Sequence, residues 1–293
     1  MARRTELDDL KLSVIASFHA RRRKILTYAD LGEILSEQRH DWQLAKSMRL
    51  QDFLSFLVDH KLIRIQDIRF RSRNYVKYLR GNVEIYDLLL SLHPESYFSH
   101  HTAMHIHSLT PHKPNAIYLN VEQRPKNRDD DAQLLQDAID KAFQKEPRIT
   151  TNVSEYDNQQ IFLLNGMYTG NLGVEELKGP KNSKVRATSL ERTVIDIAVK
   201  PAYSGGVAEV LRAYRAAKGK LSPTVVARLL KKLNFVYPFH QVVGFYMHKA
   251  GYDDSALAAI RRSRPIDLNF YLTHGMRETE YSPDWKLYFP KGL

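Results

Sequence analysis

The sequence contains no cysteine among its 293 residues. That absence excludes disulfide bonds, zinc sites built on thiolates and catalysis by a thiol. Long apolar runs are missing too, and none approaches the ~20 residues that a membrane-spanning helix needs. Acidic residues stand near the N-terminus, where a secretory signal would have its apolar core. We therefore expect a soluble, cytoplasmic protein with no membrane partner.

The usual catalytic signatures are also absent. The sequence has neither of the common glycine-rich phosphate loops and no Gly-x-Ser-x-Gly elbow. Glu191 and Asp196 are five residues apart, so a helix would place them on different faces, whereas Arg192 and Asp196 have the spacing of an ion pair. A tight turn accounts for Gly205 and Gly206 without an anion site. We expect no enzymatic activity and no cofactor.

Two clusters invite a metal-binding interpretation. His101 and His105 have the four-residue spacing of zinc ligands on a helix, but Thr-Ala-Met stands between them and no cysteine can complete a site. The run Asp129–Asp131 lies in a polar stretch, where a solvated loop ending in a helix cap is the better interpretation. We expect no metal site at either place.

Positive charge is abundant and unevenly distributed. The formal net charge is +11. Residues 1–80 contain 17 Lys and Arg against 10 Asp and Glu, whereas the remaining residues contain 27 against 23. A local excess of positive charge is typical of a surface that binds phosphate groups. This pattern indicates that such a surface lies in the first quarter of the chain.

The first 80 residues have the element order of a winged helix-turn-helix domain. Apolar spacing predicts a helix over Leu7–Ala20, a second helix that begins at the cap Thr27, and a third over Leu44–His60. Alternation predicts strands over 62–68 and 75–78, joined by a basic turn. Three helices followed by a hairpin suit DNA, because the third helix fits the major groove and the hairpin reaches the neighbouring backbone.

The predicted DNA-binding residues fall in two groups. One group stands near the start of the third helix, where base contacts are usually made. The other occupies the hairpin, where Arg69, Arg71 and Arg73 alternate and would share one face if the strand continued through them. A solvated edge that prevents strand pairing is the competing interpretation of these arginines. The full predicted set is Lys46, Ser47, Arg49, Gln51, Arg64, Arg69, Arg71, Arg73 and Lys77.

Residues 84–293 read as a larger mixed α/β domain with a helical C-terminal part. Short helices and strands alternate up to Val199, and helices are predicted over 206–217, 223–233 and 240–250. The aromatic tail, 266–293, is expected to pack as extended chain. The predicted fold class is α+β with a domain boundary near residue 80, and a further division near residue 200 is left open.

Several stretches of the second region resemble the AbiEi antitoxins of type IV toxin–antitoxin and abortive-infection systems. The stretch Tyr97–Thr110 is similar to the family's Y-x-S-h-x-S/T-A-L-x-x-h-G-L-T helix, with Met104 and Ser108 as departures. The stretch Val185–Asp196 is similar to V-x-V-x-S-x-E-R-T-L-x-D, and a glycine pair follows it. Each motif is weak alone, but their order and spacing agree over nearly the whole chain.

The resemblance implies an antitoxin that uses its winged helix to bind inverted repeats in its own promoter and to repress its operon in phage defence. It also implies that the C-terminal region counteracts a nucleotidyltransferase toxin encoded beside it. This chain lacks the Gly-Ser and paired-aspartate signature of such a toxin. Under this interpretation Ser189 caps a helix in which Arg192 holds Asp196, a structural role.

Two other classes of protein stay open. A ligand-sensing transcription factor would keep the winged helix and hold a small-molecule pocket in its C-terminal half. A nuclease targeted by the wing would need acidic metal ligands, for which Asp129 and Asp131 are the candidates. The sequence offers no paired acids that favour the nuclease.

Overall fold

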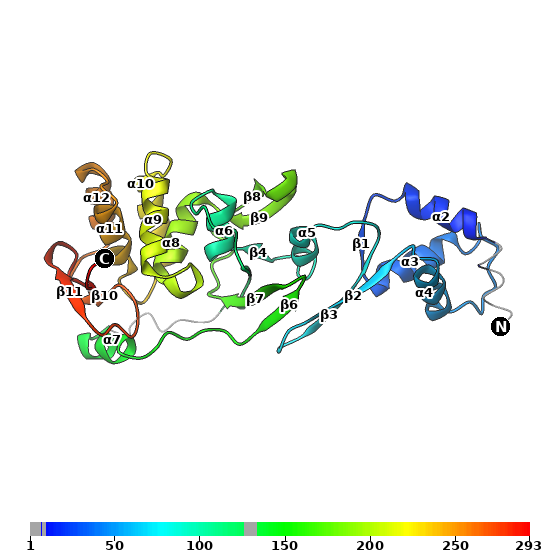
Figure 1. Cartoon of the computed structure of the whole chain (residues 1–293), viewed down its shortest axis with the longest axis horizontal. Coiled ribbons are helices and arrows are strands. Elements are labelled where there is room, and N and C mark those ends of the chain that lie inside the picture. The colour runs from blue at the N-terminus through cyan, green and yellow to red at the C-terminus, as the bar shows by residue number, and fades with distance from the viewer. Residues whose placement is uncertain (1–6, 8–9, 126–133) are drawn as a thin grey trace. The chain divides into compact units, whose positions relative to one another are not determined.

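The structure is a computed structural model that describes residue 7, residues 10–125 and residues 134–293 (Figure 1). It divides into two compact units, Met1–Leu92 and His93–Leu293. The described residues form both helices and strands, with two three-stranded sheets and one six-stranded sheet. The α+β class predicted from the sequence is confirmed. None of the helices in the described residues is both long and apolar enough to span a bilayer.

In the described residues of the first unit, helices surround an apolar core. They are α2 (Lys11–Ala20), α3 (Tyr28–Gln38) and α4 (Leu50–Asp59). The predicted cap of α3 is confirmed, because the Thr27 hydroxyl accepts from the backbone N–H of Asp30 and the Asp30 carboxylate accepts from the backbone N–H of Thr27. That exchange satisfies two backbone donors that an isolated helix start would leave open. Leu7 lies buried in the same core.

The third helix begins six residues later than the sequence predicts. Residues 44–49 are not helical, and Leu44 and Met48 are buried there. The Arg39 guanidinium donates hydrogen bonds to the backbone oxygens of Ala45 and Met48, at 2.5 and 3.0 Å. Tertiary contacts thus fix this segment as an irregular connection, which overrides its local helical periodicity.

A three-stranded sheet completes the fold of the first unit, in the order β1-β3-β2. The predicted hairpin is confirmed as β2 (Arg64–Arg69) and β3 (Asn74–Leu79), which pair antiparallel. The strand β1 (Ile25–Leu26) was not predicted and pairs with β3. The helix α5 (Ile85–Leu90) belongs to this unit. The hairpin turn begins after Arg69, so the prediction that strand alternation aligns Arg71 and Arg73 with Arg69 is wrong.

The second unit is built on a mixed six-stranded sheet in the order β6-β7-β5-β4-β9-β8. Its strands are β4 (Tyr97–Phe98), β5 (Ala116–Glu122), β6 (Val153–Tyr156), β7 (Gln159–Gly166), β8 (Val174–Lys178) and β9 (Lys184–Thr188). The pairs β5–β7 and β4–β9 are parallel, and the others are antiparallel. The strand β6 begins at Val153, and residues 148–152 before it are not part of a strand.

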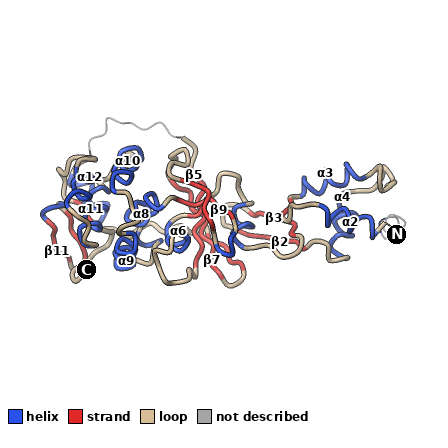
Figure 2. Tube along the Cα trace, turned by 90° about the horizontal axis from the view of Figure 1, so that it is seen from above, coloured by secondary structure: helices blue, strands red, loops and turns tan. Residues whose placement is uncertain are grey.

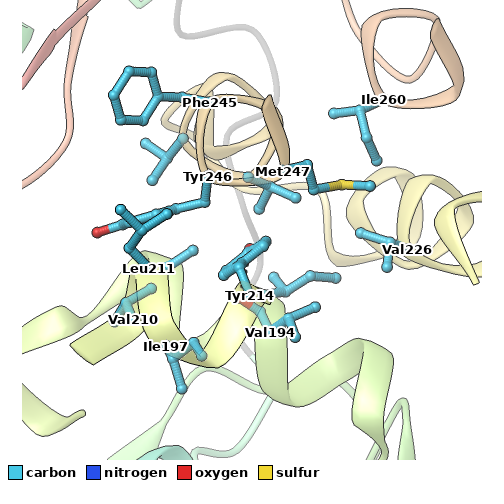
Figure 3. Close-up of a cluster of buried hydrophobic side chains, with 14 of the residues drawn as sticks. Val194, Ile197, Val210, Leu211, Tyr214, Val226, Phe245, Tyr246, Met247 and Ile260 are labelled. Carbon is cyan, nitrogen blue, oxygen red and sulfur yellow. Dashed lines mark hydrogen bonds between the residues drawn. The ribbon is translucent and has the colours of Figure 1, made fainter. Parts of the chain in front are cut away.

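Helices pack beside this sheet and form the main core of the second unit. They are α6 (His100–Ile106), α7 (Gln136–Phe143), α8 (Leu190–Val199), α9 (Val207–Ala217), α10 (Pro223–Leu233), α11 (Phe239–Lys249) and α12 (Asp254–Arg261). Figure 3 shows Val194 and Ile197 of α8 close to Tyr214 of α9 and Tyr246 of α11. The helix α8 is therefore central, because the sheet and the four helices α6, α9, α10 and α11 all pack against it.

The C-terminal segment forms a small sheet rather than unpaired extended chain. The strands β10 (Phe270–Tyr271), β11 (Thr279–Ser282) and β12 (Leu287–Pro290) pair in the order β10-β12-β11. Figure 2 labels β11 near the C-terminus. A short 3-10 helix, Pro283–Trp285, connects the last two. It inserts Trp285, which is fully buried, against Gly244 of α11. The aromatic tail thus closes the core of the helical layer.

Candidate functional site

Eight of the nine residues predicted to bind DNA are exposed on the first unit. Lys46, Ser47 and Arg49 lie in the irregular segment before α4, and Gln51 stands in its first turn. Arg49 is the N-cap residue, and its backbone N–H donates to the Asp52 carboxylate at 3.3 Å. Its own side chain therefore extends from the start of the helix, at the end that enters the groove in helix-turn-helix proteins.

The hairpin carries the other exposed cations. Arg64 and Arg69 stand at the two ends of β2, and Arg71 and Arg73 lie in the turn. The Arg69 guanidinium forms an ion pair with Asp67, so part of its charge is already neutralised. The Arg73 guanidinium lies 5.2 Å from the centre of the Tyr75 ring. The turn therefore presents cations at its tip.

Lys77 does not belong to this exposed set. It is 8% exposed, and its ammonium donates to the backbone oxygen of Ser91 at 2.6 Å. Burial lowers the pKa of the Lys77 ammonium, and the positive charge of Arg23 lowers it further. The sequence suggested a DNA contact because Lys77 is basic and stands on the hairpin. In the structure the side chain instead reaches the C-terminal end of α5, where Ser91 is the cap residue.

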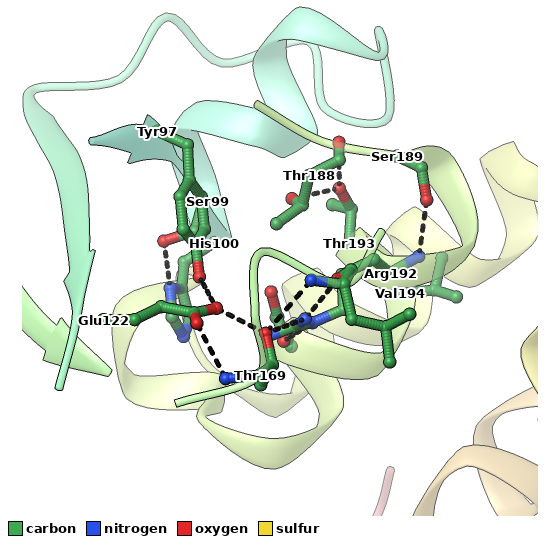
Figure 4. Close-up of polar contacts among 12 residues, drawn as sticks. Tyr97, Ser99, His100, Glu122, Thr169, Thr188, Ser189, Arg192, Thr193 and Val194 are labelled. Carbon is green, nitrogen blue, oxygen red and sulfur yellow. Dashed lines mark hydrogen bonds and ion pairs between the residues drawn. The ribbon is translucent and has the colours of Figure 1, made fainter. Parts of the chain in front are cut away.

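The second unit contains a buried polar network that includes Arg192 and Glu122 (Figure 4). The Arg192 Nε donates to the Asp196 carboxylate at 2.7 Å, and both side chains are nearly inaccessible to solvent. Burial raises the pKa of the Asp196 carboxyl, and the Arg192 guanidinium opposes that rise. The Ser189 hydroxyl caps α8 by accepting from the backbone N–H of Arg192 at 3.2 Å. The predicted cap and ion pair are both confirmed.

Glu122, at the end of β5, is the second anchor of the network. Its carboxylate accepts hydrogen bonds from the Tyr97 hydroxyl at 3.1 Å, from the Thr169 backbone at 2.7 Å and from the Asn171 backbone at 3.2 Å. Burial raises the pKa of Glu122, but these bonds outweigh it, and the pKa lies below its ordinary value. The Arg192 guanidinium also donates to the backbone oxygen of Leu172 at 2.6 Å. The network therefore fixes the loop after β7 against α8.

Strand pairing brings the two motif stretches together. Phe98 in the first stretch is the register partner of Ala187 in the second, because β4 and β9 are parallel neighbours. The His107 ring is in hydrogen-bond contact with the backbone oxygen of Thr188, with 2.7 Å between the two atoms. Both motifs therefore contribute to one region, and the sequence alone did not indicate this.

A cavity of about 960 Å³ opens beside this network. His100, at the start of α6, lines it with a backbone φ of +52°, an unusual conformation for a residue with a side chain. Burial, aided by the positive charges of Lys200 and Arg192, lowers the pKa of His100 to about 3. Its imidazole is therefore neutral and lies 2.8 Å from the Ser99 hydroxyl. Sequence reasoning missed this cavity, because its lining comes from six separate stretches of chain.

The glycine pair and the histidine pair both lie in the second unit. Gly205 and Gly206 have φ of +82° and +88°, which confirms the tight turn before α9. His101 and His105 lie on α6, and within the described residues no three His, Asp or Glu side chains are grouped as metal ligands. The run Asp129–Asp131 lies outside the described residues.

The fold thus defines a two-unit α+β protein, and comparison with solved structures shows a similarity of fold. No protein-family model matches the sequence, and no curated protein matches it significantly. Among solved structures, the chain is similar to the crystal structure of the RV2827C protein from Mycobacterium tuberculosis, with a TM-score of 0.59 and 12% sequence identity. The match covers 94% of this chain and 89% of the other. At this identity the likeness concerns the fold alone.

Proposed function

We propose that the first unit is a winged helix domain that binds double-stranded DNA, and that the chain represses its own promoter. The observation that carries this proposal is the exposure of cations both at the start of α4 and in the turn of the β2–β3 hairpin. Helix, helix, helix and hairpin follow in the order that winged helix domains use. The α4 end reads base edges, and the hairpin arginines contact phosphate groups.

The hairpin arginines provide the first test. Replacing Arg71 and Arg73 together with alanine is expected to weaken binding to the upstream region and to unrelated DNA alike, because phosphate contacts are independent of sequence. The slope of log K against log salt should become shallower by about one to two units. The measurement is a gel-shift titration of the purified protein over a salt series, with scrambled DNA as competitor.

The matched control replaces Lys231 and Lys232 with alanine. These two exposed lysines lie on α10 in the second unit, so the change in net charge is the same. Their loss should leave the salt slope unchanged. An unchanged slope in the hairpin variant as well would show that the hairpin does not touch phosphate groups.

The second unit, we propose, acts as the antitoxin of a type IV pair and neutralises a nucleotidyltransferase toxin. Support comes from the AbiEi-like motifs, which strand pairing unites beside one buried network. The polar side chains of this network are engaged with one another, which fits a structural role rather than catalysis. We therefore also propose that this chain is not an enzyme.

Coexpression with the product of the neighbouring gene tests the antitoxin role. Residues 93–293 form a compact unit, and we expect this fragment to restore growth as the full chain does. Residues 1–92 should bind DNA and give no rescue. Failure of the folded, expressed fragment to rescue growth would contradict the assignment of neutralisation to the second unit.

A further inference from the structure

We propose that the cavity beside β4 and α8 is a binding site for a nucleoside phosphate. The proposal goes beyond DNA binding and neutralisation and does not depend on either. A volume of about 960 Å³ matches the upper range of small-molecule pockets, and the site lies entirely within the second unit. Its charge, its polar floor and its aromatic wall each indicate part of such a ligand.

The charge of the cavity favours an anion. Four cationic side chains line it, those of Arg124, Arg148, Arg192 and Lys200, against the single carboxylate of Asp196. Arg192 is held by that carboxylate, so the other three cations are left to act on a ligand. Within the described part of the chain, no carboxylate forms an ion pair with any of these three. Guanidinium and ammonium groups donate charge-assisted hydrogen bonds to phosphate oxygens.

Of these three cations, Lys200 gives the strongest indication of an anion site. It stands directly after α8, and its ammonium lies 5.2 Å from the centre of the Tyr203 ring. Desolvation by the surrounding protein lowers the pKa of the Lys200 ammonium. An anion bound beside the ammonium would favour its charged form and would gain an attraction that bulk water does not screen.

Asn120 contributes a polar side chain to the cavity lining. Asn120 is 5% exposed, and its side-chain oxygen accepts from the backbone N–H of Gly166 at 3.0 Å. Within the described residues, its amide nitrogen donates to nothing. Because Asn120 lines the cavity, an acceptor on a ligand can receive a hydrogen bond from this amide. Gln123 and Asn165 add further amide groups to the same lining.

The wall of the cavity offers a surface for a planar ring. Tyr168 lines the cavity and is 50% exposed, which is unusual for so large an aromatic side chain. Ile149 lines it too and is 47% exposed. A base stacked on Tyr168 would cover apolar surface, while neighbouring amides contact its polar edge. A ring, a set of hydrogen-bonding atoms and a phosphate group together describe a nucleotide.

Calorimetric titration of the full chain tests the proposal, with the four ribonucleoside 5′-monophosphates, their nucleosides and inorganic phosphate as probes. We expect at least one monophosphate to bind at least about tenfold more tightly than its nucleoside or phosphate. Lys200→Gln and Arg148→Gln should each weaken that monophosphate about tenfold, because each removes a charge-assisted contact. Tyr168→Ala should weaken the monophosphate and leave inorganic phosphate unaffected.

The control is Lys178→Gln, which removes an exposed positive charge on β8, outside the cavity lining. It should change affinity by less than about twofold, as expected for a screened surface charge. An equal loss in this variant would show non-specific attraction and overturn the proposal. The proposal would also be overturned if inorganic phosphate bound as tightly as every monophosphate, because the base would then contribute nothing to affinity. Absence of binding by all probes to the folded wild-type chain would also refute it.

Discussion

Replacing Arg192 with methionine should lower the free energy of unfolding of the second unit by about 3–5 kcal/mol, the range seen when one partner of a buried ion pair is removed. Methionine fills a similar volume but leaves the Asp196 carboxylate buried without its partner. The backbone oxygen of Leu172 also loses its hydrogen bond. Urea unfolding followed by circular dichroism and by Trp285 emission, in a Trp42→Phe background, provides the measurement.

The free energy of unfolding that the Arg192→Met variant loses should depend on pH in a defined direction. Without Arg192, burial and the negative charge of Glu122 act on Asp196 unopposed, so its pKa in the folded state rises further above the unfolded value. The folded variant then binds a proton more readily than the unfolded chain, and its stability falls as pH rises between those two pKa values. The destabilisation should therefore shrink as pH falls from about 7 toward about 4.

A double variant separates the ion pair from other effects. Arg192→Met combined with Asp196→Leu removes both charges, and much of the lost stability should return because no unpaired charge stays buried. If the double variant is as unstable as the sum of the two single variants, the two residues are not energetically coupled, contrary to the structure.

Replacing Gly244 with alanine should destabilise the second unit by about 3 kcal/mol, the upper part of the range for overpacked cores. A Cβ at this position of α11 would lie far inside van der Waals contact distance of the Trp285 ring. The ring has no room to retreat, since it is fully buried and the Arg261 guanidinium lies 4.8 Å from its centre. Thermal unfolding monitored by Trp285 emission and circular dichroism measures the effect.

A matched glycine lies on α3. Gly32→Ala places its Cβ 3.5 Å from Leu50, an ordinary contact, and the helix favours alanine. This variant should be stabilised by about 0.5–1 kcal/mol. Trp42 lies in the core of the first unit and Trp285 in the core of the second, so the emission of each tryptophan reports on the unfolding of one unit. Gly244→Ala with wild-type stability would refute the packing of Trp285 against α11.

Local features were predictable because they depend on neighbouring residues. The Thr27 and Ser189 caps each follow from a side chain that reaches a backbone N–H three residues away. The bounds of α10, Pro223–Leu233, also match, since Ser222 precedes a proline at its start and Asn234 ends it with φ of +42°.

Of the candidate DNA interface, the sequence placed eight residues correctly at the surface and misplaced one. Lys77 looked like its exposed neighbours because the hairpin alternation does not show which face the rest of the unit covers. The late start of α4 has the same origin, since contacts from Arg39 hold residues 44–49 out of the helix. These errors arise where distant contacts outweigh local preference.

The sequence by itself determined the helix caps, the hairpin, the excess of cations in the first unit and the pairing of Arg192 with Asp196, because each involves residues close together in the chain. Only the tertiary structure decided that β4 and β9 are neighbours, that Trp285 closes the helical core, and that Asn120, Tyr168 and Lys200 line one cavity. Strand order and cavity walls depend on contacts between distant segments, which the alternation of apolar and polar residues does not encode.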